Sequence, residues 1–273
     1  MIRAELREIC RQARRAPPEC TAAMARLPTW DTVKAAFQHF FGHLWLFEVA
    51  AWPWLAILAL WKAVAIAFGL SAQDSPIIQV VETGWQWLAE IAVAVAWHRA
   101  ILLSEPAAGR PRFGRAELRY LGIGIALTLG MAAAFLPAGM AAGSGAPQAT
   151  VGGLVMVGAL IASLLAVVTA RCYLALPGAA IGSAIGLAES WRRTSGNGWR
   201  LFWGMIACAL PGSAVIIVWE SLIDAVSQPD GLARALASLV TAGCGLAGTA
   251  IVAGFLSFAY LWFDRSARGS ASP

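Results

Sequence analysis

Residues 171–203 read RCYLALPGAAIGSAIGLAESWRRTSGNGWRLFW, and this stretch decides how the chain is organised. It leaves one long apolar segment at Leu176 and Pro177, passes through a glycine-rich piece and two adjacent arginines, and enters the next apolar segment at Trp199. A charged connection between two long apolar runs is typical of a loop between membrane-spanning helices. We therefore interpret this stretch as a cytoplasmic hinge between two membrane spans.

The composition excludes an ordinary soluble protein. Hydrophobic residues make up 59% of the 273 residues, charged residues make up 13%, and the mean hydropathy is +0.67. Several mostly uncharged runs are long enough to cross roughly 30 Å of hydrocarbon as a helix. The alternation expected of barrel strands is missing, so the sequence predicts an all-α integral membrane protein.

The basic residues and the cysteines narrow the function classes further. The net charge of +5 does not indicate nucleic-acid binding, because the basic residues flank apolar runs and so point to orientation and to anionic lipid headgroups. The five cysteines are odd in number and lack CxxC spacing, which predicts free thiols rather than a disulfide framework or a zinc site. No cofactor is expected. The N-terminal residues lack the apolar core of a signal peptide, so we expect no cleavage.

Two amphipathic segments precede the apolar runs. Residues 1–28 are basic, and a helix there can lie on an anionic membrane or simply in solvent, two alternatives that the sequence leaves open. A second helix is expected to start near Thr29 or Asp31. One side of it carries Val33, Ala36, Phe37, Phe40 and Phe41. We expect this second helix to lie in the membrane interface.

Six membrane spans are predicted in a membrane domain of residues 29–263, followed by a cytoplasmic tail of residues 264–273. The spans are residues 44–69, 76–103, 118–140, 151–176, 199–224 and 232–263. The connections alternate in charge, and of twenty Lys and Arg residues only Lys62 and Arg234 fall on the second side. The positive-inside rule then places both termini in the cytoplasm of a bacterial inner membrane. Trp97 is expected in an aromatic belt at the inner boundary.

Ionisable residues inside spans require partners, because a charge near the bilayer centre costs about 2.5 to 3.5 kcal/mol on insertion scales. The sharper hypothesis is an intramembrane polar cluster of Lys62 with Glu82, Glu90 or Glu220. The alternative is that Lys62, Glu82 and Glu220 extend separately to the outer interface. Glu90 lies too deep for that and is expected to be protonated or paired.

A second group of polar residues lies near the inner boundary. Glu48 is predicted to form an ion pair with Arg99, with His98 at the same depth. His39 and His43 are four residues apart, a spacing that can bind a metal if Glu48 completes the site. Structural histidines remain the better interpretation, because a metal site needs three or four ligands.

Glycines at a spacing of four residues predict close helix packing. Gly178, Gly182 and Gly186 would form a flat face on one helix, suited to tight association within the chain or in a homo-oligomer. The run lacks the GxxxxGK[ST] pattern of a phosphate-binding loop.

Two short pieces carry a resemblance to known proteins. They are AWHRAILL at residues 96–103 and ESWR with NGWRLF at residues 189–192 and 197–202. From about Thr29 onward the chain resembles uncharacterised multi-pass inner-membrane proteins of proteobacteria. It is also similar in plan to the membrane domain attached to some bacterial glycerophosphodiester phosphodiesterases. The resemblance implies a membrane module without its own chemistry.

The sequence therefore favours a non-enzymatic membrane scaffold, or a module that binds lipids or a protein partner. The alternative is a small transporter or permease-like component that uses Glu90 and Lys62. A third class, a lipid-modifying enzyme, requires a site built from His43, Glu48, His98 and Arg99. No Ser, His and Asp arrangement or GxSxG motif indicates catalysis.

Overall fold

The computed structural model describes residues 26–68, 75–106, 114–145, 147–183, 185–225 and 231–269, and every regular element among them is a helix. The all-α prediction is therefore confirmed for this part of the chain. The amphipathic segment predicted for residues 1–28 lies outside the described residues except for its last three.

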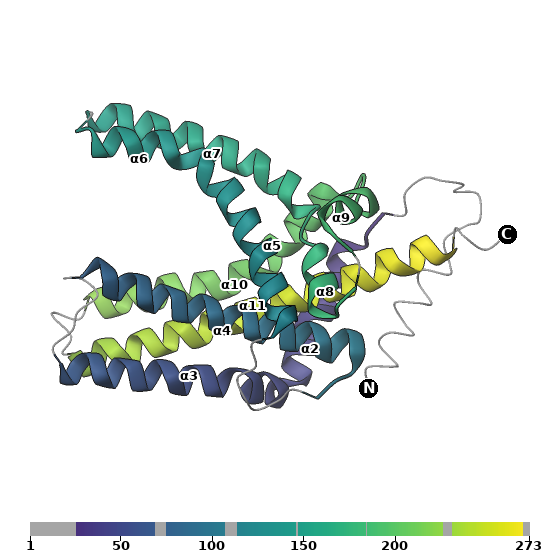
Figure 1. The fold of residues 1–273 in the computed structure, drawn as a ribbon, viewed down its shortest axis with the longest axis horizontal. Helices are drawn as coiled ribbons and strands as arrows, with labels where there is room; N and C mark the ends of the chain where they lie inside the picture. The colour runs from purple at the N-terminus through teal and green to yellow at the C-terminus, as the bar shows by residue number, and fades with distance from the viewer. Residues whose placement is uncertain are drawn as a thin grey trace.

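Four long helices run side by side and form a bundle (Figure 1). They are α3 (Leu44–Ala67), α4 (Pro76–Leu103), α10 (Gly198–Ala225) and α11 (Gly231–Gly269). Helix α11 packs against the other three, and its residues from Ala253 to Tyr260 are all buried. A helix that is apolar on most sides is expected at the centre of a fold, and α11 has that position.

A second unit of the fold is a helical hairpin. Helix α5 (Arg115–Ala132), the short η1 (Ala133–Phe135) and α6 (Leu136–Gly143) form one arm, and α7 (Gln148–Ala170) forms the other. The hairpin leans away from the bundle and meets it near α8 (Figure 1). Most of its large apolar side chains are exposed, as expected for a surface that lipid covers.

Five helical segments are long and apolar enough to cross a membrane. They are Leu44–Ala67, Arg115–Gly143, Gln148–Ala170, Gly198–Ile223 and Leu232–Ser266. They correspond to five of the six predicted spans. The remaining predicted span is α4, which has the length for crossing but carries Glu82, Glu90 and Arg99 and is not among the five.

The fourth predicted span ends earlier than expected. It was predicted to reach residue 176, but α7 ends at Ala170. The carbonyl oxygen of Arg171 accepts hydrogen bonds from the hydroxyl groups of Ser190 (2.6 Å) and Thr194 (3.2 Å). These side chains satisfy a carbonyl at the helix end, where no amide of the same helix is available.

The predicted cytoplasmic hinge is partly interior. Helix α8 (Ala175–Ala180) is buried at all six residues and contacts α4, α5 and α11. Only α9 (Leu187–Arg193) and the turn after it resemble the surface connection that the sequence suggests. The hinge therefore inserts a short apolar helix between the hairpin and the bundle.

Helix α2 (Thr29–Gly42) docks on the bundle rather than lying free of it. It contacts α10 and α11 and buries Val33, Ala36 and Phe40, three of the five residues predicted to share its apolar side. Phe41 is 63% exposed instead, and His39 takes an inward position at 2% exposure. The inward face of α2 is thus rotated from the predicted one by about one residue.

Candidate functional site

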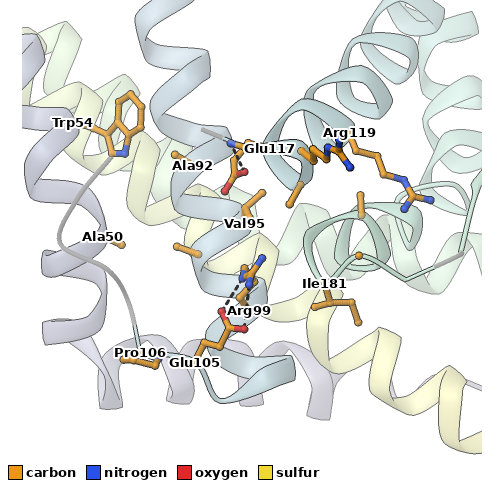
Figure 2. A pocket seen from close by; sticks show the side chains of 16 residues that line it. Ala50, Trp54, Ala92, Val95, Arg99, Glu105, Pro106, Glu117, Arg119 and Ile181 are labelled. Atoms are coloured by element: carbon orange, nitrogen blue, oxygen red, sulfur yellow. Dashed lines mark hydrogen bonds and ion pairs between the residues drawn. The ribbon is translucent and has the colours of Figure 1, made fainter. Parts of the chain in front are cut away.

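A cavity of about 540 Å³ opens beside α4, at the end of the bundle where α8 lies (Figure 2). One part of its lining is apolar and contains Ala50, Trp54, Ala92, Val95, Ala96 and Ile181. The other part is charged and contains Arg99, Glu105, Arg115, Glu117 and Arg119. Ligand pockets commonly have volumes of roughly 300–1,000 Å³. The cavity is therefore large enough for part of an amphipathic molecule, and its lining is amphipathic too.

Arg99 lies in this cavity and pairs with Glu105. Its Nε donates to Oε2 of Glu105 at 2.8 Å, and Nη2 donates to Oε1 at 3.1 Å. The predicted ion pair between Glu48 and Arg99 is wrong. Helix α4 ends at Leu103, and Ser104, with φ of 56°, turns the chain so that Glu105 returns to Arg99. Glu48 is exposed on α3 and has no ion pair with another described residue.

The Arg99–Glu105 pair is open to exchange with another anion. The side chains are 37% and 43% exposed. An ion pair at such exposure contributes about 0–1 kcal/mol to stability, because water and salt screen it. An incoming anion can therefore compete with Glu105 for the Arg99 guanidinium.

Two more arginines reach the cavity from α5. Arg115 and Arg119 are one helical turn apart, so their side chains leave the same face of the helix. Arg119 Nη1 donates to the Ser183 carbonyl oxygen at 2.9 Å, which ties α5 to the segment after α8. Arg115 has no ion pair with another described residue. Glu117 Oε2 accepts from the Gly114 N–H at 2.8 Å, so this acid caps the helix start.

A separate groove of about 280 Å³ lies where the hairpin joins the bundle. Small residues of α10 and α11 form much of its floor, among them Ala209, Gly212, Gly245 and Gly248. Glu90 stands behind this floor, since a Cβ on Gly245 would lie 3.8 Å from Glu90 Oε1. The groove also contains Cys244, a free thiol like Cys172 and Cys208.

His98 is the centre of a buried hydrogen-bond chain. It is 0% exposed, and its Nδ1 lies 2.7 Å from Ser257 Oγ. Because the Ser257 hydroxyl donates to the Ala253 carbonyl oxygen, Nδ1 of His98 must be the donor to Ser257. Nε2 is then the acceptor that faces the Tyr120 hydroxyl at 3.5 Å. The network fixes one tautomer of a neutral histidine.

This position separates His98 from the residues proposed to act with it. Sequence reasoning placed it at an inner interface with Glu48 and Arg99, but its partners are Ser257 and Tyr120. Its neighbour Trp97 is 1% exposed and packs in the core rather than in an aromatic belt. Helix α4 is covered by α11 on this side, and the sequence of α4 alone does not reveal that contact.

The four residues of the predicted intramembrane cluster are divided among three places. Lys62 Nζ donates to Glu82 Oε2 at 2.8 Å, and Trp61 Nε1 donates to Glu82 Oε1 at 3.3 Å, so α3 and α4 share this ion pair. Glu90 accepts from Gln86 Nε2 at 3.1 Å. Glu220 accepts from the Thr241 hydroxyl between α10 and α11. Lys62 and Glu82 therefore meet, whereas Glu90 and Glu220 have other partners.

His39 and His43 stack on each other with ring centroids 4.2 Å apart. His43 Nδ1 donates to the His39 carbonyl oxygen at 2.9 Å, and neither ring nitrogen of His39 has a hydrogen-bond partner among the described residues. Burial, with a smaller contribution from His43, lowers the pKa of His39 to about 4. Among the described residues, no three His, Cys, Asp or Glu side chains gather as a metal site.

The glycines of the hinge do not form one helical face. Gly178 lies in α8, Gly182 follows that helix with φ of 71°, and Gly186 is the N-cap of α9. The Ser183 N–H donates to the Gly178 carbonyl oxygen and the Gly182 N–H to that of Ala179, the pattern of a Schellman motif. Only Gly178 makes a close approach, since a Cβ there would lie 2.9 Å from Ser183 Oγ.

Comparison of the chain with family models, with curated proteins and with solved structures gave no match. The resemblance seen in the two short sequence pieces therefore stays a prediction. The geometry of the amphipathic cavity and the distribution of charge are the observations on which a functional proposal can rest.

Proposed function

We propose that the chain is a non-enzymatic, multi-pass protein of a bacterial inner membrane. In this proposal it is a scaffold or a module that binds lipid or a protein partner, with its basic end in the cytoplasm. The resemblance to membrane domains that lack their own chemistry points in the same direction.

The observation that carries the proposal is the unequal distribution of positive charge along the bundle. The end formed by α2, α8 and α9 holds Lys34, Arg99, Arg115, Arg119, Arg171, Arg192, Arg193 and Arg200. Among the described residues, the opposite end holds Lys62 and Arg234. Positive charge gathers on the cytoplasmic side of membrane proteins and attracts the anionic lipids of that leaflet.

The proposal includes α4 as a sixth membrane crossing. Its 28 residues run beside α3 and α11, and at about 1.5 Å per residue they exceed the hydrocarbon thickness. Each of its charged side chains has a partner: Glu82 with Lys62, Glu90 with Gln86, and Arg99 with Glu105. Pairing reduces the free energy of placing such groups in a membrane.

Topology reporters test the number of crossings and the orientation. With six crossings, reporters at both termini and after Glu105 and Ser195 lie in the cytoplasm, and a reporter after Gly143 lies outside. With five crossings, in which α4 does not span, the two termini lie on opposite sides. If the reporters after Glu105 and after Gly143 lie in the same compartment, the proposed crossing of the membrane by α5 and α6 is refuted.

Purification in mild detergent tests the role itself. A stably retained protein, or anionic lipid enriched over its share of the membrane, supports the scaffold or binding module. A small solute that is retained with the protein, and released by Glu90→Gln or Lys62→Met, would instead support a carrier.

A further inference from the structure

We propose that the amphipathic cavity between α3, α4, α5 and α8 binds an anionic phosphate group, carried by a phospholipid of the cytoplasmic leaflet. Arg115 and Arg119 hold the phosphate, and Arg99 joins them when Glu105 gives way. This inference rests on the proposed function, because it requires the basic end of the bundle to face the cytoplasm.

The charged side of the cavity complements an anion. Three arginines from two different helices line it, against the two glutamates Glu105 and Glu117. Glu117 accepts from the Gly114 N–H and keeps its charge, so three arginines and two glutamates leave the lining with a net charge of +1. Arg115 and Arg119 are exposed, and the bond from Arg119 to Ser183 uses one of its five N–H donors. Two guanidinium groups one turn apart can therefore bind phosphate oxygens in the paired geometry that favours arginine.

The apolar side of the cavity argues for a lipid rather than a free anion. Ala50 and Trp54 of α3 and Ala92 and Val95 of α4 line the same space (Figure 2). Ala96 of α4 lines it too. The lining on α4 runs from Ala92 to Arg99, which corresponds to about 10 Å along the helix. On α4 the apolar wall and Arg99 thus follow each other along one axis, and Arg115 and Arg119 join the lining from α5. A phospholipid offers the same order, with acyl chains toward the membrane centre and phosphate at the interface.

Glu105 occupies the position of a competing anion in this arrangement. Its two oxygens contact Arg99, at 2.8 and 3.1 Å, in the two-pronged geometry that a phosphate also adopts with arginine. A phosphate held by Arg115 and Arg119 can replace Glu105 at Arg99 because that pair is partly exposed. The Glu105 carboxylate therefore weakens phosphate binding by competing for Arg99. Replacing Glu105 with the neutral glutamine should tighten the binding of phosphate.

The experiment uses the full chain in mild detergent and measures binding by native mass spectrometry. The probes are dioleoyl phosphatidylglycerol, dioleoyl phosphatidylcholine and inorganic phosphate. The variants are Arg115→Gln with Arg119→Gln, Glu105→Gln and Ala96→Leu. Arg192→Gln serves as the control, because Arg192 lies on the same basic end outside the cavity with a side chain that is 80% exposed.

We expect the wild-type protein to prefer phosphatidylglycerol over phosphatidylcholine. The double arginine variant should bind phosphatidylglycerol at least tenfold more weakly, Glu105→Gln should bind it more tightly, and Arg192→Gln should match the wild type. Ala96→Leu should weaken lipid binding without affecting inorganic phosphate. Thermal midpoints without lipid check that each variant is folded. The double arginine variant should change the midpoint only slightly, because the Arg119–Ser183 hydrogen bond that it removes is exposed.

The outcomes separate this inference from the proposed function. Equal binding of phosphatidylglycerol by the wild type and a folded double arginine variant would overturn the assigned site, while the binding module could stand. If the wild type binds inorganic phosphate and shows no preference between the lipids, the site recognises free phosphate and the lipid assignment is overturned. If the topology reporters place Glu105 outside the cytoplasm, the proposed orientation of the protein is overturned, whatever the binding measurements show.

Discussion

The backbone N–H of Leu27 donates to the side-chain oxygen of Asn197 at 2.9 Å, across 170 residues of sequence. Both residues are buried. The carbonyl oxygen of Leu27 also accepts from Arg200 Nη1 at 2.9 Å. Both backbone polar groups of Leu27 are therefore bonded to residues at the start of α10. The entry of the chain into α2 is thereby fixed to the second half of the protein.

Asn197→Ala is expected to lower the free energy of unfolding by about 1–3 kcal/mol, because it leaves the Leu27 N–H buried without an acceptor. The thermal midpoint in detergent measures the change. Ser221→Ala is the control, since the exposed Ser221 hydroxyl donates to the Ile217 carbonyl oxygen within its own helix. Equal midpoints for the two variants would show that this contact does not hold α2 in place.

Gly204 of α10 lies directly against Phe255 of α11. A Cβ at this position would overlap the ring of Phe255, which is 0% exposed. Gly204→Ala should therefore destabilise the protein by about 1–3 kcal/mol through overpacking. Gly243→Ala on α11 is the matched control, because no other heavy atom of the described residues lies within 4 Å of a Cβ there.

A second substitution distinguishes this clash from a change in helix propensity. Phe255→Leu in the Gly204→Ala background shortens the side chain that the new methyl group meets, so we expect the double variant to regain part of the lost stability. No recovery, measured by thermal midpoint, would mean that the ring is not the cause.

The apolar helices were predictable from sequence, whereas the contacts between them were not. Long uncharged runs locate α3, α5, α7, α10 and α11, because each must be apolar regardless of its neighbours. Which residues of two helices touch depends on the face that each helix turns toward the other. Helix α11 is apolar on most sides, so its sequence does not identify that face. Glycine spacing pointed to Gly182 and Gly186, but the close approach of two spans occurs at Gly204.

The polar partners show the same limit. The positions of Lys62 and Glu82 along their predicted spans placed both residues at the same depth in the membrane. In the structure the two side chains form an ion pair. The partner of Arg99 depends on the left-handed turn at Ser104, which has no glycine to signal it. The partners of His98 come from α5 and α11. The His98 contacts join residues 22 and 159 positions apart in sequence, so no local pattern predicts them.

The ion pair between Lys62 and Glu82 should show strong coupling in a double-mutant cycle. The side chains are 19% and 20% exposed, so each protects the other from an apolar environment. Lys62→Met and Glu82→Gln should each reduce stability, and the double variant should lose less than the sum of the two by about 0.5–3 kcal/mol. Strictly additive losses of thermal stability would indicate that the two groups reach the outer interface independently.

The docking of α2 should weaken in acid because of His39. Its side chain lies between His43, Trp97 of α4 and Phe258 of α11, and in the part of the chain that the structure describes its ring nitrogens have no hydrogen-bond partner. Burial lowers the pKa of His39 in the folded state to about 4, below its ordinary value of 6.5. The folded state therefore binds fewer protons than the unfolded state between these values. The contribution of His39 to the free energy of unfolding is therefore fully present above pH 6.5. It falls as the pH drops toward 4.

The size of the effect follows from the shift of pKa. At about 1.4 kcal/mol per pKa unit, the fall from 6.5 to about 4 corresponds to about 3–4 kcal/mol of stability that acid removes. His39→Phe keeps an aromatic ring at the site and cannot be protonated, so its thermal midpoint should change less between pH 7 and acid than that of the wild type. Limited proteolysis near α2 should show the same difference, because protonated His39 favours release of that helix. Parallel loss of stability in both proteins would assign the acid sensitivity to groups other than His39.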